Sequence, residues 1–214
     1  MNSKTQTTKM RRRERTCTDA LERALKGQGY RLIAGVDEVG RGAWAGPVVA
    51  AAVILDLDRL PDGLDDSKRL SPNRREQLFD AIHETACAIA LGIVDAREID
   101  RTDIRRATER AMRQAIEGLH PRPDFILVDA VSLDGLDIPH QALIRGDQLS
   151  VSIAAASIIA KVTRDRLMRD YDRLYPGYGF AHHVGYGTRA HRDALARLGP
   201  CPLHRLSFRG IRQS

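Results

Sequence analysis

The strongest constraint on the fold is a series of short apolar segments that alternate with helical ones. Segments 31–37, 47–57, 87–96 and 124–130 have the apolar, often β-branched character of strands, and 141–146 is a weaker fifth. Helices are predicted over 18–27, 71–86, 99–119, 150–174 and 190–198. Thr18 and Ser71 are the predicted caps of the first two, and Pro72 is expected as the first helical residue after Ser71. This order predicts an α/β fold with a mixed five-stranded sheet flanked by helices.

Length and composition favour one domain with a basic extension. The chain has 214 residues and is 43% hydrophobic, which is enough for a substantial core. Residues 1–17 are predicted to be a basic flexible arm. Residues 18–214 are predicted to form a single domain that includes a C-terminal helical region at about 170–214, because no linker composition divides them.

Several classes of protein are disfavoured. No apolar stretch reaches the roughly 18 residues of a membrane span, and the first 15 residues lack the apolar core of a secretory signal. The three cysteines, Cys17, Cys87 and Cys201, form no framework. We therefore expect a cytoplasmic protein without a membrane partner, and a monomer, since no oligomer signal is evident.

The net charge of +6 conceals an uneven distribution. Residues 1–30 carry eight basic and three acidic residues, residues 31–144 carry 14 and 20, and residues 145–214 carry 12 and five. An acidic middle followed by a basic end favours an interaction with a polyanion, provided that the acids have a function of their own.

Four acids stand where burial is expected. Asp37 and Glu38 end one predicted strand, Asp129 ends another, and Asp165 interrupts the apolar stripe of a helix. Each alone fits a simpler interpretation: a strand-end carboxylate facing water, or for Asp165 an ion pair with Lys161 or Arg169. Asp147, in a predicted loop, is a weaker candidate.

Together, the four carboxylates predict a cation site. Clustered carboxylates cannot stay ionised in a core without cations, and oxygen ligands without Cys or His favour Mg²⁺ or Mn²⁺. Two such ions suit in-line attack of water on a phosphodiester, because both the attacking and the leaving oxygens need stabilising.

Six ordered blocks resemble the bacterial ribonuclease HII family over about residues 31–210. They are GVDEVGRGAWAGPVVAAAVIL, DDSKRLS, ILVDA, SIAAASIIAKVTRDRLM, YGFAHHVGYGT and HRLSF. The resemblance implies a ribonuclease-H-like fold and a metal-dependent endonuclease. Its substrates would be RNA–DNA hybrids and duplex DNA with embedded single ribonucleotides, which it nicks on the 5′ side. One departure is Thr102-Asp103, where the family is expected to have Leu-Asn.

The resemblance also implies roles for individual residues. The family's metal-binding, catalytic carboxylates match Asp37, Glu38, Asp129 and Asp165. Its loop that contacts the ribose 2′-hydroxyl and the flanking phosphates matches Gly40, Arg41 and Gly42, whose glycines let the backbone approach nucleic acid. Tyr186 matches a tyrosine that packs on the sugar after the ribonucleotide. Phosphate contacts are expected from Lys68, Lys161 and Arg164.

Two other functions stay open on the sequence alone. A related metal nuclease, such as a junction resolvase, would cut all-DNA substrates. A non-catalytic nucleic-acid-binding protein would use the basic end only and would leave the buried acids unexplained. His182, His183 and His204 are expected to have structural or phosphate-contact roles, and Ser67 and Ser157 lack the partners of a nucleophile.

Overall fold

A five-stranded mixed sheet forms the centre of the computed structural model, which describes residues 17–211. The strand order is β3-β2-β1-β4-β5. The strands are β1 (Ile33–Val39), β2 (Val48–Leu55), β3 (Ala86–Val94), β4 (Phe125–Asp129) and β5 (His140–Leu143). β1 to β3 pair antiparallel, whereas β4 pairs parallel with β1 and with β5. The predicted mixed five-stranded sheet with flanking helices is confirmed.

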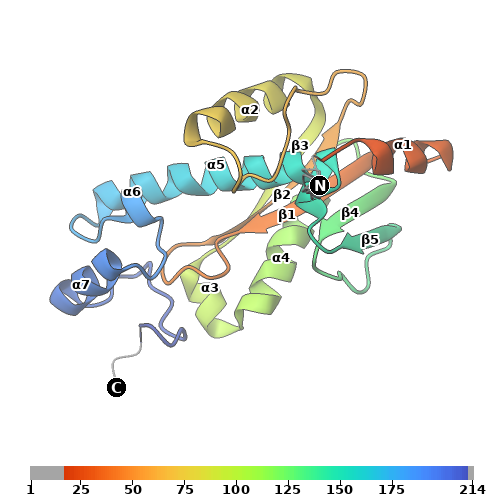
Figure 1. Ribbon diagram of the computed structural model, residues 1–214. Coiled ribbons are helices and arrows are strands. Elements are labelled where there is room, and N and C mark those ends of the chain that lie inside the picture. The colour runs from red at the N-terminus through yellow and green to blue at the C-terminus, as the bar shows by residue number, and fades with distance from the viewer. Residues whose placement is uncertain (1–16, 212–214) are drawn as a thin grey trace, which may run out of the picture.

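Helices cover both faces of the sheet (Figure 1). Alternate residues of β2 point to opposite layers, as the pleat of a strand requires. Val49, Ala51 and Val53 pack against α2 (Pro72–Thr85) and α5 (Val151–Leu174). Ala50, Ala52 and Ile54 pack on the other side, against α4 (Ile104–Glu117). β2 is therefore buried on both faces, which explains its uninterrupted apolar sequence.

Two predicted helix starts have different outcomes. Ser71 caps α2 by accepting a hydrogen bond from Arg74 N, and Pro72 is the first helical residue, as predicted. Helix α1 (Ala20–Gly27) begins after Asp19 without a side-chain cap, so the predicted cap at Thr18 is wrong. Thr18 instead forms an isolated parallel bridge with Ser150.

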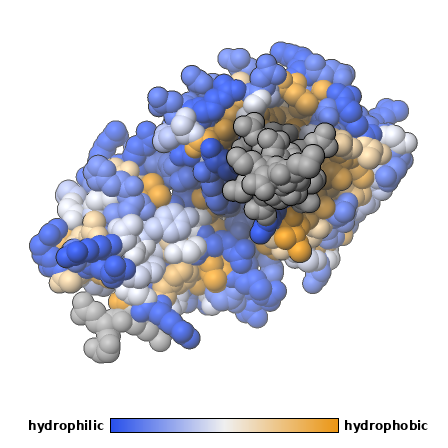
Figure 2. Space-filling model, in the orientation of Figure 1, coloured by the Kyte–Doolittle hydropathy of each residue, from blue (hydrophilic) through white to orange (hydrophobic). Residues whose placement is uncertain are grey.

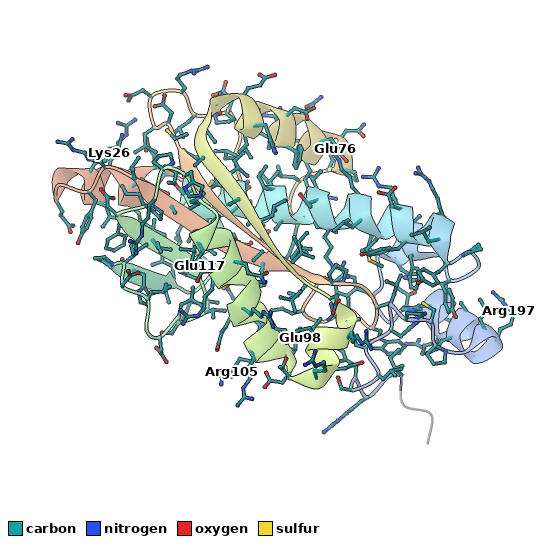
Figure 3. The ribbon with its side chains drawn as sticks, turned by 180° about the vertical axis from the view of Figure 1, so that it is seen from behind. Lys26, Glu76, Glu98, Arg105, Glu117 and Arg197 are labelled. Atoms are coloured by element: carbon teal, nitrogen blue, oxygen red, sulfur yellow. The ribbon has the colours of Figure 1, made fainter. Side chains whose placement is uncertain are left out.

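The single helix predicted over 99–119 is two helices, α3 (Ala96–Arg101) and α4. Asp103 causes the break, because its carboxylate accepts a hydrogen bond from Arg106 N at 2.8 Å and caps α4. The corner is bridged by Glu98, whose carboxylate accepts from Arg110 at 2.7 Å (Figure 3). Asp103 supplies here the capping oxygen that an Asn could also provide.

The C-terminal part packs on the loop between β1 and β2. It contains α6 (Phe180–His183), which packs against α5, and α7 (Arg189–Leu198), which lies below α6 in the view of Figure 1. Trp44 N donates to Gly185 O at 2.8 Å, and Arg205 N donates to Trp44 O at 2.8 Å. The loop 40–47 is therefore held by segments that follow it by about 140 residues or more.

The outer surface agrees with this layering. In the view of Figure 2, hydrophilic residues cover the upper rim of the molecule and the region of α7. None of the helices within residues 17–211 combines the length and apolar character that a membrane crossing needs. The predicted arm over 1–17 lies outside the described residues except for Cys17, and so do residues 212–214.

Close backbone packing at Gly92 leads to a prediction about stability. A Cβ at Gly92 on β3 would lie 1.9 Å from Ala111 O on α4, so Gly92→Ala forces the helix away from the sheet. We expect the free energy of unfolding, measured by urea denaturation, to fall by about 1–3 kcal/mol. Gly27→Ala is the control, because a Cβ there meets nothing within 4 Å. It should leave stability unchanged or raised by about 0.5 kcal/mol. Equal stability of the two variants would contradict the packing described.

Candidate active site

Parallel pairing brings two buried-strand acids to one edge of the sheet. Val36 of β1 is opposite Val128 of β4, so the next residues along the two strands are Asp37 and Asp129. Both strands run in the same direction, and their carboxyl ends therefore meet at the same edge. Asp37 is 4% exposed, which makes it one of the few buried acids among residues 17–211.

A third acid joins them from a turn before α5. Asp147 lies in the short 3₁₀ helix η1 (Gly146–Gln148) and is 3% exposed. Gly146 N donates a hydrogen bond of 2.7 Å to Asp129 Oδ1, which fixes the turn against the end of β4. One carboxylate oxygen from each of Asp37, Asp129 and Asp147 lies within 4.8 Å of the others. We call these three residues the carboxylate cluster.

Two charged residues border the carboxylate cluster. Glu38 is mostly buried and forms an ion pair of 3.2 Å with Arg41. Lys68 places its Nζ 3.6 Å from Asp147 and 3.8 Å from Asp66, while most of its side chain stays exposed. Burial alone would lower the pKa of Lys68, but the surrounding carboxylates, led by Asp66, raise it. Lys68 thus supplies only part of the positive charge that these acids require.

The electrostatics of the carboxylate cluster favour a cation. Burial, followed by repulsion from Glu38 and Asp129, raises the pKa of Asp37 well above its ordinary value. Burial, then Asp66 and Asp129, raise the pKa of Asp147 to about 6. Burial also raises the pKa of Asp129. The ionised forms are costly here because positive charge is insufficient, so a bound divalent cation would lower these pKa values.

Asp165 is not brought into the carboxylate cluster. Ser157 on α5 lies beside the carboxylate of Asp37, and Asp165 follows eight residues later, about 12 Å along the helix axis. Its Oδ1 accepts a hydrogen bond of 2.6 Å from Lys161, the simpler alternative that the sequence allowed. Asp165, Lys161 and Arg169 line a separate cavity of about 450 Å³ beside α2.

Asp147, which the sequence indicated only as a weaker candidate, and Asp66, which it did not indicate at all, are the further buried acids of this region. The signal for Asp147 was its position just after the weak fifth strand. Because β5 is parallel to β4, an acid following it falls at the same edge as Asp129. Asp66 had no such signal, since it lies in the polar loop before α2 and is brought in by tertiary packing alone.

The loop residues 40–42 and Tyr186 lie side by side, although they are far apart in the sequence. A Cβ built at Gly42 would lie 3.9 Å from the Tyr186 ring, and that ring is 37% exposed. Gly40 has a φ of +92°, and a Cβ there would lie 2.2 Å from Arg164 Nε, so only glycine fits. Gly42 and Tyr186 therefore lie on one exposed surface, whereas Gly40 is buried.

Arg164 is too deeply buried to make the predicted contact with a phosphate. Its side chain is 0% exposed, and its donors are used by backbone carbonyls, so a direct contact with substrate requires another conformation. Lys161 is ion-paired with Asp165 and mostly covered. Of the three predicted phosphate-binding cations, Lys68 alone is well exposed.

The buried histidines support the Tyr186 turn. Cys201 N donates to His204 Nδ1, so His204 Nε2 carries the proton and donates to His191 Nε2 at 3.0 Å. His191 Nδ1 then donates to Tyr186 O at 3.0 Å. Burial lowers the pKa of His191 to about 4, which keeps this chain neutral. The hydroxyls of Ser67 and Ser157 bond each other at 2.7 Å, without a basic partner for nucleophilic chemistry.

Comparisons with known proteins agree on one family. The family model described as ribonuclease HII matches residues 34–211. A ribonuclease HII of Geobacter sulfurreducens is 58% identical over 186 residues, which cover 87% of this chain and 86% of the relative. The crystal structure of ribonuclease H2 from Pyrococcus horikoshii superposes with a TM-score of 0.74 at 28% identity, covering 85% of this chain and 96% of that one. The structure of the PCNA:RNase HII complex from Archaeoglobus fulgidus gives a TM-score of 0.71 at 28% identity. The match covers 86% of this chain and 98% of the matched chain.

The raised pKa of Asp147 predicts a pH-dependent effect of Asp147→Asn on metal-free protein. Asp147 has a pKa of about 6 when folded, against the ordinary 3.8, so the wild type loses stability as the pH rises from about 4 to above 6. Asn cannot ionise and escapes this loss. Between pH 4 and pH 7.5, the free energy of unfolding of Asp147→Asn should therefore rise relative to that of the wild type by about 1 kcal/mol, after allowance for solvent screening.

Asp137→Asn is the matched control for this measurement. The carboxylate of Asp137 is exposed and paired with Arg122, whose hydrogen bond lowers the pKa of Asp137. Over the same pH range, the free energy of unfolding of Asp137→Asn should fall relative to that of the wild type or stay unchanged. Adding Mg²⁺ should raise the unfolding midpoint of the wild type more than that of Asp147→Asn. A pH-independent effect of Asp147→Asn would contradict the electrostatics described.

Proposed function

The chain belongs to the ribonuclease HII family, and from this premise we propose that its carboxylate cluster is the active site for cutting RNA within duplexes. As a member of this family it is a metal-dependent endonuclease, a hydrolase that acts on RNA–DNA hybrids. The observation that carries the assignment of the site is the approach of three carboxylate oxygens to within 4.8 Å of one another at the sheet edge.

The residues of this site suit Mg²⁺ or Mn²⁺. The donors of Asp37, Asp129 and Asp147 are carboxylate oxygens, the ligands that hard divalent cations prefer. We propose these three as ligands, with Glu38 as a fourth beside them, and two ions bound during catalysis. When bound, such ions supply the positive charge that stabilises the attacking and leaving oxygens of a phosphodiester. The earlier prediction for Asp165 stays a prediction, and the geometry favours Asp147 in its place.

The remaining predicted residues would position the substrate. Gly40, Arg41 and Gly42 would contact the ribose 2′-hydroxyl, which DNA lacks, and Tyr186 would pack on the following sugar. Lys68 is an exposed cation whose Nζ lies 3.6 Å from Asp147, and it would contact a phosphate bound at the carboxylate cluster. This arrangement supports incision 5′ to a single ribonucleotide in duplex DNA, leaving 5′-phosphate and 3′-hydroxyl ends.

The setting of this activity is also proposed. Cys17, Cys87 and Cys201 are all free thiols, which fits the reducing interior of a cell and supports a cytoplasmic location. We propose that the chain acts as a monomer on nucleic acid, because all the elements of the site come from one chain.

Three substitutions separate the candidate metal ligands. Asp129→Asn and Asp147→Asn keep the size of the side chain but remove a ligand charge. They should lower Mg²⁺- or Mn²⁺-dependent nicking by about 100-fold or more. Asp165→Asn, at the separate cavity, should stay within about tenfold of wild type. Near-full activity of Asp129→Asn would overturn the site. Loss of activity in Asp165→Asn but not in Asp147→Asn would restore the original prediction for Asp165.

Substrate choice tests the function itself. Labelled DNA duplexes with and without one embedded ribonucleotide, and an RNA–DNA hybrid, are incubated with Mg²⁺ or Mn²⁺. We expect cutting of the ribonucleotide duplex and of the hybrid, and none of the all-DNA duplex, because recognition requires a 2′-hydroxyl. Cutting of the all-DNA duplex would favour a nuclease of another type. Metal-independent binding without any product would favour a non-catalytic protein.

A further inference from the structure

Two fully buried arginines lie beneath the loop 40–47. Arg164, on α5, and Arg205, after α7, are both 0% exposed. All of their hydrogen bonds, at 2.8 to 3.1 Å, go to backbone carbonyls. The acceptors are Pro47, Ala45 and Val184 for Arg164, and Gly46 and Arg41 for Arg205. Arg164 therefore connects the loop 40–47 to the segment that carries Tyr186, and Arg205 connects the same loop to the segment after α7.

Neither guanidinium has a carboxylate partner. Within residues 17–211, no Asp or Glu forms an ion pair with Arg164 or Arg205. The two acids that act on them from further away are bound elsewhere: Asp165 to Lys161, and Asp100 to the backbone of Leu206 and Ser207. Burial lowers the pKa of Arg164, and burial together with Arg164 lowers that of Arg205 to about 9. Buried charges without a counter-ion are costly, so their retention needs a reason.

Arg205 also determines the orientation of one peptide group. Its Nη1 donates a hydrogen bond of 2.9 Å to Arg41 O, so the carbonyl of the peptide between Arg41 and Gly42 faces the interior. In a trans peptide the N–H lies on the opposite edge, and Gly42 N–H therefore faces away from the guanidinium. Gly42 is exposed, and its N–H has no acceptor within the described part of the chain. An outward N–H above a buried cation is an arrangement suited to an anion.

We propose that Arg164 and Arg205 are a buried cationic pair whose counter-ion is a phosphate of the bound nucleic acid, received at the loop through Gly42 N–H. Both are positioning residues: they act through the loop backbone and do not touch the substrate. The inference rests on the proposed function, since it requires a polyanionic substrate at this loop. It gives Arg164 a role in substrate binding without the direct contact that the resemblance implied.

The salt dependence of cleavage tests the charge. With a duplex containing one ribonucleotide and fixed Mg²⁺, kcat and KM are measured from about 50 to 200 mM KCl. We expect Arg205→Gln to lower kcat/KM about tenfold or more, mainly through KM. The slope of log(kcat/KM) against log[KCl] should become shallower by about one, because one phosphate loses its counter-charge. Arg205→Lys keeps the charge and should keep the wild-type slope, although it loses part of the hydrogen bonding.

Arg122→Gln is the control for net charge. Arg122 is exposed, pairs with Asp137 and precedes β4, at the opposite edge of the sheet from the carboxylate cluster. Its substitution should leave both KM and the slope unchanged. A wild-type slope in folded Arg205→Gln would overturn the proposal, since a purely structural role would lower activity without changing the slope. If the wild type itself fails to cut this duplex, the proposed function fails instead.

A measurement on the wild type alone covers the case in which Arg205→Gln does not fold. Phosphates around the ribonucleotide are replaced one at a time by neutral methylphosphonates, leaving the scissile phosphate intact. The proposal expects one position whose neutralisation lowers kcat/KM about tenfold or more and makes the salt slope shallower by about one. If no flanking phosphate has this effect, the proposal is wrong.

Discussion

The parallel pairing of β1 with β4 is the constraint on which the rest of the site depends. It places Asp37 and Asp129 at one edge of the sheet, although 92 positions separate them in the sequence. The parallel addition of β5 then delivers the turn with Asp147 to the same edge, where Gly146 N bonds Asp129. Without this direction of pairing, the three carboxylates would end at opposite sides of the sheet and no shared cation site could form.

Local sequence signals predicted the elements well, because each depends on neighbours along the chain. The cap at Ser71 and the apolar run of β2 are examples. The predicted helix over 99–119 was wrong because Asp103 can either continue a helix or cap one, and periodicity alone does not decide between them. Asp37 and Asp129 could be selected as site residues since a charge at the end of an apolar strand is conspicuous.

Tertiary contacts explain what the sequence could not show. Asp147 has no apolar neighbours that mark it as buried, and its position depends on the pairing of a weak strand. Asp165 has the right apolar spacing, yet it pairs with Lys161 on the same helix. Arg164 looked like a surface cation next to an acid, but the close approach permitted by Gly40 puts it inside the protein. For Asp147 and Arg164 the deciding contact comes from another segment of the chain, whereas for Asp165 it lies one turn away on the same helix.

The fold keeps the carboxylate cluster and the two buried arginines, Arg164 and Arg205, apart from protein groups of opposite charge that would neutralise them. An acidic cluster can hold divalent cations only if protein cations do not neutralise it, and buried arginines can attract a phosphate only if carboxylates do not. Backbone carbonyls solve the second requirement, because they satisfy the donors of Arg164 and Arg205 while leaving their charge uncancelled. The net charge of +6 therefore says little about function. What matters is that the fold keeps negative charge at the sheet edge apart from positive charge beneath the neighbouring loop, as the proposed binding of metal ions and of a phosphate requires.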